Sequence, residues 1–183
     1  MIRRSFLALA CGTMMLAACG FQLRGQQDYA FKRLAIVGAP PAVAARLTRM
    51  IQGGSDTVVV SSPDNADAVL NVSEGRGSSV LTLNSLGVAE EYQLNYTLGY
   101  SLTSADGAVL IPPSSIALNR AMTYSTQYSQ AKTQESELLY TDMRNDAVDQ
   151  LTRRLAAVHS LHPAPSQRTP GVVPRAPLPP PPL

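Results

Sequence analysis

Residues 92–103 alternate strictly between apolar and polar or small side chains, and this pattern narrows the possible folds more than any other feature. The apolar set is Tyr92, Leu94, Tyr96, Leu98, Tyr100 and Leu102, and the other set is Gln93, Asn95, Thr97, Gly99, Ser101 and Thr103. Because successive side chains of a strand point to opposite faces, the run predicts a long strand with one packed face and one wet face. That arrangement is typical of an antiparallel sheet.

The residues before this strand predict a strand–helix–strand unit. Residues 31–38 are typical of a first strand, and the proline pair at 40–41 can open a helix, because the first turn does not need their missing N–H groups. Apolar residues then recur at helical spacing up to the glycine pair at 53–54, and residues 57–61 form a short β-branched strand. The order predicts a right-handed βαβ unit.

Further strands are predicted on both sides of the alternating run. Residues 66–83 have a period of two, with a bulge or bend expected at Gly75-Arg76-Gly77. Residues 84–87 predict a turn, residues 105–107 a hairpin, and alternation resumes over residues 116–128.

A long helix is predicted over residues 132–158, with Thr133 as its N-cap and Glu135 and Glu137 in its first turn. Its apolar stripe consists of Leu139, Met143, Ala147, Leu151, Leu155 and Val158. The middle of the chain is therefore expected to be a sheet bracketed by two helices.

The first residues have the pattern of a secretory signal over residues 1–18. Two arginines, Arg3 and Arg4, precede an apolar run over residues 6–15, which is shorter than the roughly twenty residues that span a bilayer. Leu16-Ala17-Ala18-Cys19 then resembles the lipobox of bacterial lipoproteins, in which the cysteine thiol is acylated and the chain is cut before it. The alternative is an ordinary signal peptide whose cysteine lies just beyond the cut.

Cleavage changes both the thiol content and the charge of the chain. Cys11 would be removed and Cys19 acylated, which leaves neither a free thiol nor a disulfide. Loss of Arg3 and Arg4 leaves 13 basic residues against 13 acidic ones. Because nucleic-acid-binding proteins usually carry a basic excess, this balance argues against nucleic acid as a partner.

The sequence contains no cluster typical of catalysis, a metal site or a cofactor. Both histidines, His159 and His162, fall at the end of the predicted long helix, with no third metal ligand near them in sequence. Glu90 and Glu91 are neighbours in a strand and so point to opposite faces. We therefore expect no enzyme activity, no metal and no cofactor.

Three segments together resemble the LptE family of lipopolysaccharide-assembly lipoproteins. They are Cys19–Gly25, the strand opening Glu91-Tyr92-Gln93-Leu94, and residues 142–155 of the predicted long helix. The resemblance implies an α+β two-layer sandwich, with two helices packed on one face of a mixed, mostly antiparallel sheet of four to five strands. It places the folded domain at residues 31–160, after a lipidated linker over residues 19–30.

The resemblance also implies partners and a location. The family's partner is the LptD-type outer-membrane β-barrel, whose lumen the lipoprotein plugs, and its ligand is lipopolysaccharide. The expected location is the outer membrane, which Gly20 after the cysteine also favours, with acyl chains in the inner leaflet and the protein facing the periplasm and the barrel lumen. A barrel lumen is polar and wet. The uncharged polar residues Asn95, Thr97, Asn119, Thr123, Ser125 and Gln127 would suit such surroundings.

Lipopolysaccharide carries phosphates, so a binding site for it needs cations. Lys132 falls where the family has a basic residue at the entry to its last helix, and Arg76 and Arg120 are further candidates. The family's second basic position, in the turn before the alternating strand, is occupied here by Asn84-Ser85-Leu86. For each of the three cations, the alternative is a solvated side chain with a purely structural role.

Two other functions remain open from the sequence. A lipid carrier facing the periplasm would hold lipid in a large apolar cavity between helices and sheet. An enzyme would need a catalytic cluster in a concave site.

Residues 161–183 form a proline-rich tail that is expected to be disordered or polyproline-like, because it cannot bury apolar surface. We predict that truncation before Pro163 leaves the unfolding midpoint in urea unchanged. A large loss of stability in the truncated protein would move the domain boundary into the tail.

Overall fold

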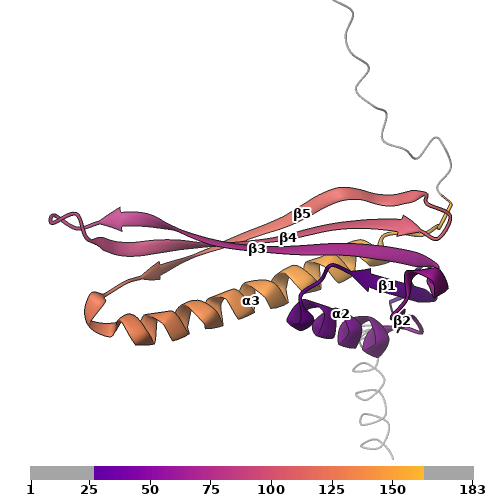
Figure 1. Cartoon of the computed structure of the whole chain (residues 1–183), viewed down its shortest axis with the longest axis horizontal. Helices are drawn as coiled ribbons and strands as arrows, with labels where there is room; N and C mark the ends of the chain where they lie inside the picture. The colour runs from indigo at the N-terminus through magenta and orange to yellow at the C-terminus, as the bar shows by residue number, and fades with distance from the viewer. Residues whose placement is uncertain (1–26, 163–183) are drawn as a thin grey trace, which may run out of the picture.

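The predicted alternating strand is β4 (Ala89–Ser104), the fourth of five strands in one sheet of order β2-β1-β3-β4-β5. A computed structural model describes residues 27–162, and the signal, Cys19 and most of the proline-rich tail lie outside these residues. The other strands are β1 (Arg33–Val37), β2 (Val58–Val60), β3 (Ala68–Leu83) and β5 (Val109–Thr123). The helices α2 (Pro41–Gly54) and α3 (Ser129–Ala156) form the second layer (Figure 1).

The sheet is mixed, as expected. β1 pairs in parallel with both β2 and β3, so the predicted strand–helix–strand unit is present, with α2 as its crossover. β3, β4 and β5 pair antiparallel over almost their whole lengths. The α+β sandwich with two helices is thus confirmed.

The core lies between the sheet and the two helices. Leu94, Tyr96, Leu98, Tyr100 and Leu102 of β4 are all buried, so the predicted inward row of this strand is correct. α2 covers the β1 end with Val43, Leu47 and Ile51, and α3 covers β4 with a stripe of fully buried residues, Met143, Ala147, Leu151 and Leu155. Each helix buries one face, as helical spacing of apolar residues requires.

The start of α3 differs from the prediction. The helix begins at Ser129, and Tyr128, not Thr133, is its N-cap residue. A 3₁₀ turn over Thr126–Tyr128 ends the preceding extended segment and winds directly into α3, which is why β5 stops at Thr123 and the helix starts early. Thr133 therefore lies inside the helix, where its hydroxyl donates to the Ser129 carbonyl at 3.0 Å.

The bulge in β3 also lies elsewhere than expected. Gly75 and Gly77 keep regular pairing with Thr97 and Asn95, and the register shifts instead after Val80. β5 begins earlier than the predicted residue 116 and includes Pro112 and Pro113. Because β5 is an edge strand of the sheet, the missing proline N–H groups break no ladder that the sheet needs.

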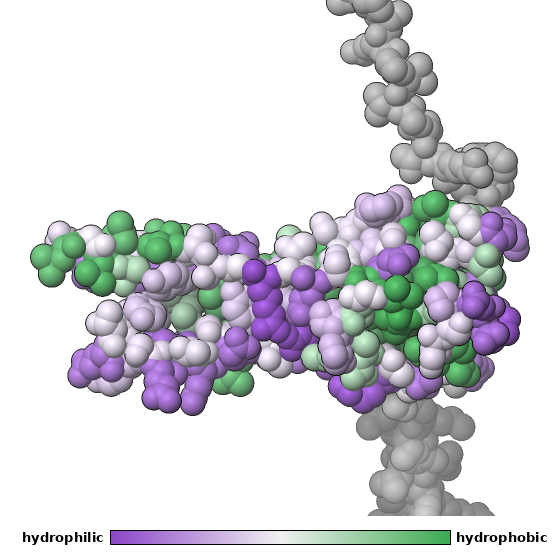
Figure 2. All heavy atoms as spheres, viewed as in Figure 1, coloured by the Kyte–Doolittle hydropathy of each residue, from purple (hydrophilic) through white to green (hydrophobic). Residues whose placement is uncertain are grey.

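The hairpin of β3 and β4 extends beyond the start of α3, so its far end is not covered by a helix (Figure 1). Figure 2 shows hydrophobic residues gathered at this projecting end.

Gly38, directly after β1, fits a position that only glycine tolerates. Its φ is +75°, and a Cβ added there would lie 2.8 Å from the backbone oxygen of Val72 in β3. We predict that Gly38→Ala lowers the free energy of unfolding by about 2–3 kcal/mol, because left-handed strain and a backbone clash add together.

Gly107→Ala is the matched control for this prediction. Gly107 has a φ of +85° but no atom within 4 Å of an added Cβ, so its substitution should cost only the backbone strain, about 1 kcal/mol. Urea unfolding measures both variants. If Gly38→Ala and Gly107→Ala lowered the free energy of unfolding equally, the close approach of Gly38 to Val72 would contribute nothing to the loss.

Candidate functional site

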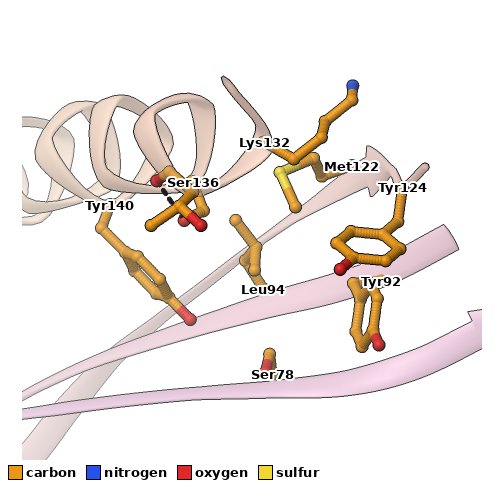
Figure 3. A pocket seen from close by; sticks show the side chains of 9 residues that line it. Ser78, Tyr92, Leu94, Met122, Tyr124, Lys132, Ser136 and Tyr140 are labelled. Atoms are coloured by element: carbon orange, nitrogen blue, oxygen red, sulfur yellow. Dashed lines mark hydrogen bonds between the residues drawn. The ribbon is translucent and has the colours of Figure 1, made fainter. Parts of the chain in front are cut away.

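A pocket of about 200 Å³ opens where the first turns of α3 lie over the ends of the long strands (Figure 3). Its lining combines aliphatic, phenolic and hydroxyl groups with one cation: Ser78, Tyr92, Leu94, Met122, Tyr124, Lys132, Thr133, Ser136 and Tyr140. The residues come from β3, β4, β5 and α3 and from the segment between β5 and α3. The site therefore exists only because the sheet and the long helix pack together.

Lys132 supplies the positive charge at the rim of this pocket. Its Nζ donates to the Thr123 hydroxyl at 3.1 Å and to Glu135 Oε2 at 2.8 Å, and its side chain is 19% exposed. In Figure 3 the ammonium group points away from Tyr140 and Leu94. The pocket thus has an apolar floor and a cation at its edge.

Three tyrosines shape the walls of the pocket. Tyr92 and Tyr124 contact each other edge to face, with ring centroids 5.2 Å apart. The Tyr140 hydroxyl donates to the Gly77 carbonyl at 2.7 Å, and burial raises the pKa of this phenol. The hydrogen bond of Tyr140 and the edge-to-face pair of Tyr92 and Tyr124 fix the positions of these aromatic walls.

Arg76, the second candidate, does not line the pocket but joins the sheet to α3. Its guanidinium lies 3.2 Å from Glu137 of α3 and 3.5 Å from Glu74 of its own strand. It also lies over the ring of Tyr140, 5.2 Å from the centroid. Arg76 therefore orients Tyr140, and through it one wall of the pocket.

Glu74 is a largely buried carboxyl group that the sequence analysis did not single out. Its side chain is 11% exposed and accepts a hydrogen bond from Arg144 Nε at 3.0 Å. Burial, together with the Glu74 carboxylate, raises the pKa of the neighbouring Tyr96 phenol. Glu74 falls in the inward-facing row of the strand predicted over residues 66–83. Because a buried charge needs a partner, this position could have indicated an ion pair with a helix.

Arg120, the third candidate, lies on β5. Its Nη2 is 3.9 Å from Asp146 of α3, and its Nη1 donates to the Asn119 carbonyl. Each candidate cation thus has its own carboxylate partner on α3, and only Lys132 lines the pocket.

The sheet face turned away from the helices carries a single charged side chain along its three long strands, Glu91 near the β3–β4 turn. Away from Glu91, a continuous set of residues on this face is small or uncharged and polar: Asn71, Ser73, Gly75, Gly77 and Ser79 of β3, Gln93, Asn95, Thr97, Gly99 and Ser101 of β4, and Ser115, Ala117, Asn119 and Ala121 of β5. We call this set the neutral face. Ser125 and Gln127 lie in the segment before α3 and not on this face, although the sequence analysis grouped them with Asn95, Thr97 and Asn119.

The structure also bears on His162, on metal-binding groups and on membrane-spanning helices. His162 lies 3.4 Å from Asp106, and its side chain is mostly exposed. Across residues 27–162, no group of three or more histidine, cysteine, aspartate or glutamate side chains is arranged to hold a metal. Neither α2 nor α3 is long and apolar enough to cross a membrane.

Known proteins resemble this chain in both sequence and structure. It is 29% identical over 166 residues to the LPS-assembly lipoprotein LptE of Yersinia enterocolitica, which covers 84% of this chain and 76% of that protein. The corresponding protein of Photorhabdus laumondii is 24% identical over 158 residues, covering 84% and 86%.

Solved lipoproteins share the fold. Lipoprotein B of Nitrosomonas europaea has a TM-score of 0.64 at 31% identity and covers 75% of this chain and 91% of its own. Rare lipoprotein B of Shewanella oneidensis has a TM-score of 0.57 at 21% identity, covering 68% and 94%.

The family model described as "LptE: Lipopolysaccharide-assembly" matches residues 27–155, which span β1 to the last turn of α3 and include both the pocket and the neutral face. The chain belongs to the LptE family of lipopolysaccharide-assembly proteins.

Proposed function

We propose that this chain is the lipoprotein subunit of an outer-membrane lipopolysaccharide translocon, anchored by acyl chains on Cys19 and seated in the lumen of an LptD-type β-barrel. In this role the chain acts by binding and positioning, and it catalyses no reaction. Family membership supports the part in lipopolysaccharide assembly. The neutral face is the observation on which the proposed position inside the barrel rests.

A barrel lumen is polar and filled with water, and a plug must make many contacts without burying charge. Uncharged hydroxyl and amide groups meet this requirement, because they exchange water for lumen side chains or for bridging waters at low cost. Asn95, Thr97 and Asn119 lie exposed at the centre of the neutral face. We assign this face to the contact with the barrel wall.

Lipopolysaccharide is an anionic amphiphile, and the pocket below α3 has the matching chemistry. Lys132 offers a positive charge at the rim, while Leu94 and Met122 offer apolar surface inside. In this proposal Lys132 contacts a phosphate, and Arg76 and Arg120 hold α3 on the sheet.

A carrier with an enclosed lipid cavity fits this chain less well. Leu98, Leu102, Met143 and Leu151 between β4 and α3 are fully buried and belong to one packed core. The pocket below α3, at about 200 Å³, is smaller than ordinary small-molecule sites of roughly 300–1,000 Å³.

We predict that an LptD-type barrel co-purifies one to one with the tagged wild-type chain from outer membranes. Thr97→Arg should reduce this recovery strongly, because it places a charge at the centre of the neutral face. Thr141→Arg is the matched control, since Thr141 is equally an exposed threonine but lies on α3. Mass spectrometry of the purified complexes measures the ratio. Unchanged recovery with Thr97→Arg would remove the neutral face from the interface.

We also predict that Lys132→Glu weakens lipopolysaccharide binding by about tenfold or more, the loss expected for one hydrogen bond to a charged group. Lys132→Gln should also weaken binding, because it removes the charge while keeping an N–H donor on a side chain one atom shorter. Thermal unfolding should change little, because a partly exposed ion pair adds little stability. Arg120→Gln, which removes a cation outside the pocket, should leave the affinity unchanged. If the Arg120 variant lost affinity for lipopolysaccharide and the Lys132 variants kept it, the binding site would lie at the edge of β5 instead.

A further inference from the structure

The turn between β3 and β4 carries an exposed aliphatic cluster that the proposed function leaves without a role. We call its five residues the hairpin tip, and their exposed fractions are Val80 48%, Leu81 49%, Leu83 59%, Leu86 85% and Val88 44%. No charged residue occurs between Arg76 and Glu90. Figure 2 shows this group at the projecting end of the molecule. Contiguous exposed apolar surface of this kind marks an interaction site.

The backbone of the turn is suited to an apolar environment. The side-chain oxygen Asn84 Oδ1 accepts hydrogen bonds from the N–H groups of Leu86 and Val88, at 2.9 and 3.0 Å. The backbone of Asn84 also pairs with Gly87 and Val88. Groups that already have partners inside the turn do not need water, and unsatisfied groups are what make hydrocarbon costly for a polypeptide.

The side chains behind the tip become more polar in a definite order. Val80 pairs directly with Tyr92, which meets Tyr124 edge to face in the pocket wall, and Lys132 lies at the rim of the same pocket. Aliphatic groups, then phenols, then a cation is the order in which proteins meet the acyl chains, the interface and the headgroups of lipids.

The strand edges limit how deeply the tip can enter a lipid phase. β1 pairs with β3 only over Ala68–Asn71, so the outer edge of β3 beyond that segment has no strand partner among the described residues. Open strand edges are not tolerated in hydrocarbon. The turn itself can therefore be buried in acyl chains, whereas the strands behind it cannot.

We propose that the hairpin tip inserts among the acyl chains of the same lipopolysaccharide molecule whose phosphate contacts Lys132. This inference rests on the proposed function, because it assigns the lipid part of that ligand to a second, adjoining surface. The pocket alone is too small for several acyl chains, and the tip supplies the missing apolar contact next to it.

The chain contains no tryptophan, so a single introduced tryptophan reports its own surroundings. We predict that in the full mature chain carrying Leu86→Trp, addition of purified lipopolysaccharide shifts the tryptophan emission to shorter wavelength and reduces its quenching by acrylamide. Val109→Trp is the matched control. Val109 is 56% exposed and lies at the start of β5, at the opposite end of the long strands, so its emission should not change.

The choice of ligand identifies the occupant of the tip. Fully deacylated lipopolysaccharide should leave the Leu86→Trp emission unshifted, and phosphatidylcholine vesicles should not reproduce the shift. A shift of equal size on those vesicles, or one that appears only when the barrel protein is added, would overturn the proposal in favour of a bilayer or a protein contact.

An affinity measurement separates this inference from the proposed function. Leu86→Asn should weaken binding of lipopolysaccharide by about tenfold, the value of one buried leucine, and leave binding of the deacylated form unchanged. If Lys132-dependent binding persists while Leu86→Asn has wild-type affinity and Leu86→Trp keeps its solvent emission, only this inference fails. If lipopolysaccharide does not bind at all, both fail.

Discussion

The packing of α3 against the inward row of β4 is the contact on which the rest of the structure depends. Leu94, Tyr96 and Leu98 are buried beneath a helix of 28 residues, and each large side chain of this kind contributes about 1.5–3 kcal/mol. Charges that fall inside this contact must be neutralised there. Glu74 meets this condition through Arg144, and Arg76 links the same strand to Glu137.

The lengths of the packed elements explain why the hairpin tip is uncovered. A helix of 28 residues spans about 42 Å, whereas β3 and β4, with 16 residues each, span about 53 Å. One helix therefore cannot cover both ends of the hairpin. The pocket forms where helical cover ends, and Tyr92 and Tyr124 close the core at that point.

Local pattern was sufficient for most of the fold, but not for the ion pairs. The family resemblance, not local pattern, pointed to Lys132, which lines the pocket. Alternation identified the inward row of β4 because its period depends only on neighbouring residues. Glu74 and Arg144 lie 70 positions apart, so nothing local indicates that they meet. The early start of α3 was missed because a 3₁₀ turn over Thr126–Tyr128 leads into the helix without a side-chain cap, and such turns have no strong pattern.

The distribution of charge is the basis of the proposed contact between the neutral face and a partner. The exposed side of α3 carries Glu135, Glu137 and Asp142, whereas the neutral face has no ionised group. Desolvating a charge costs several kcal/mol unless a well-placed partner compensates, and uncharged polar groups avoid that cost. A surface that stays in water has no need to avoid charge. The absence of charge across the neutral face, with Glu91 alone beside it on the same side of these strands, is the reason we propose that this face meets a partner while α3 faces the solvent.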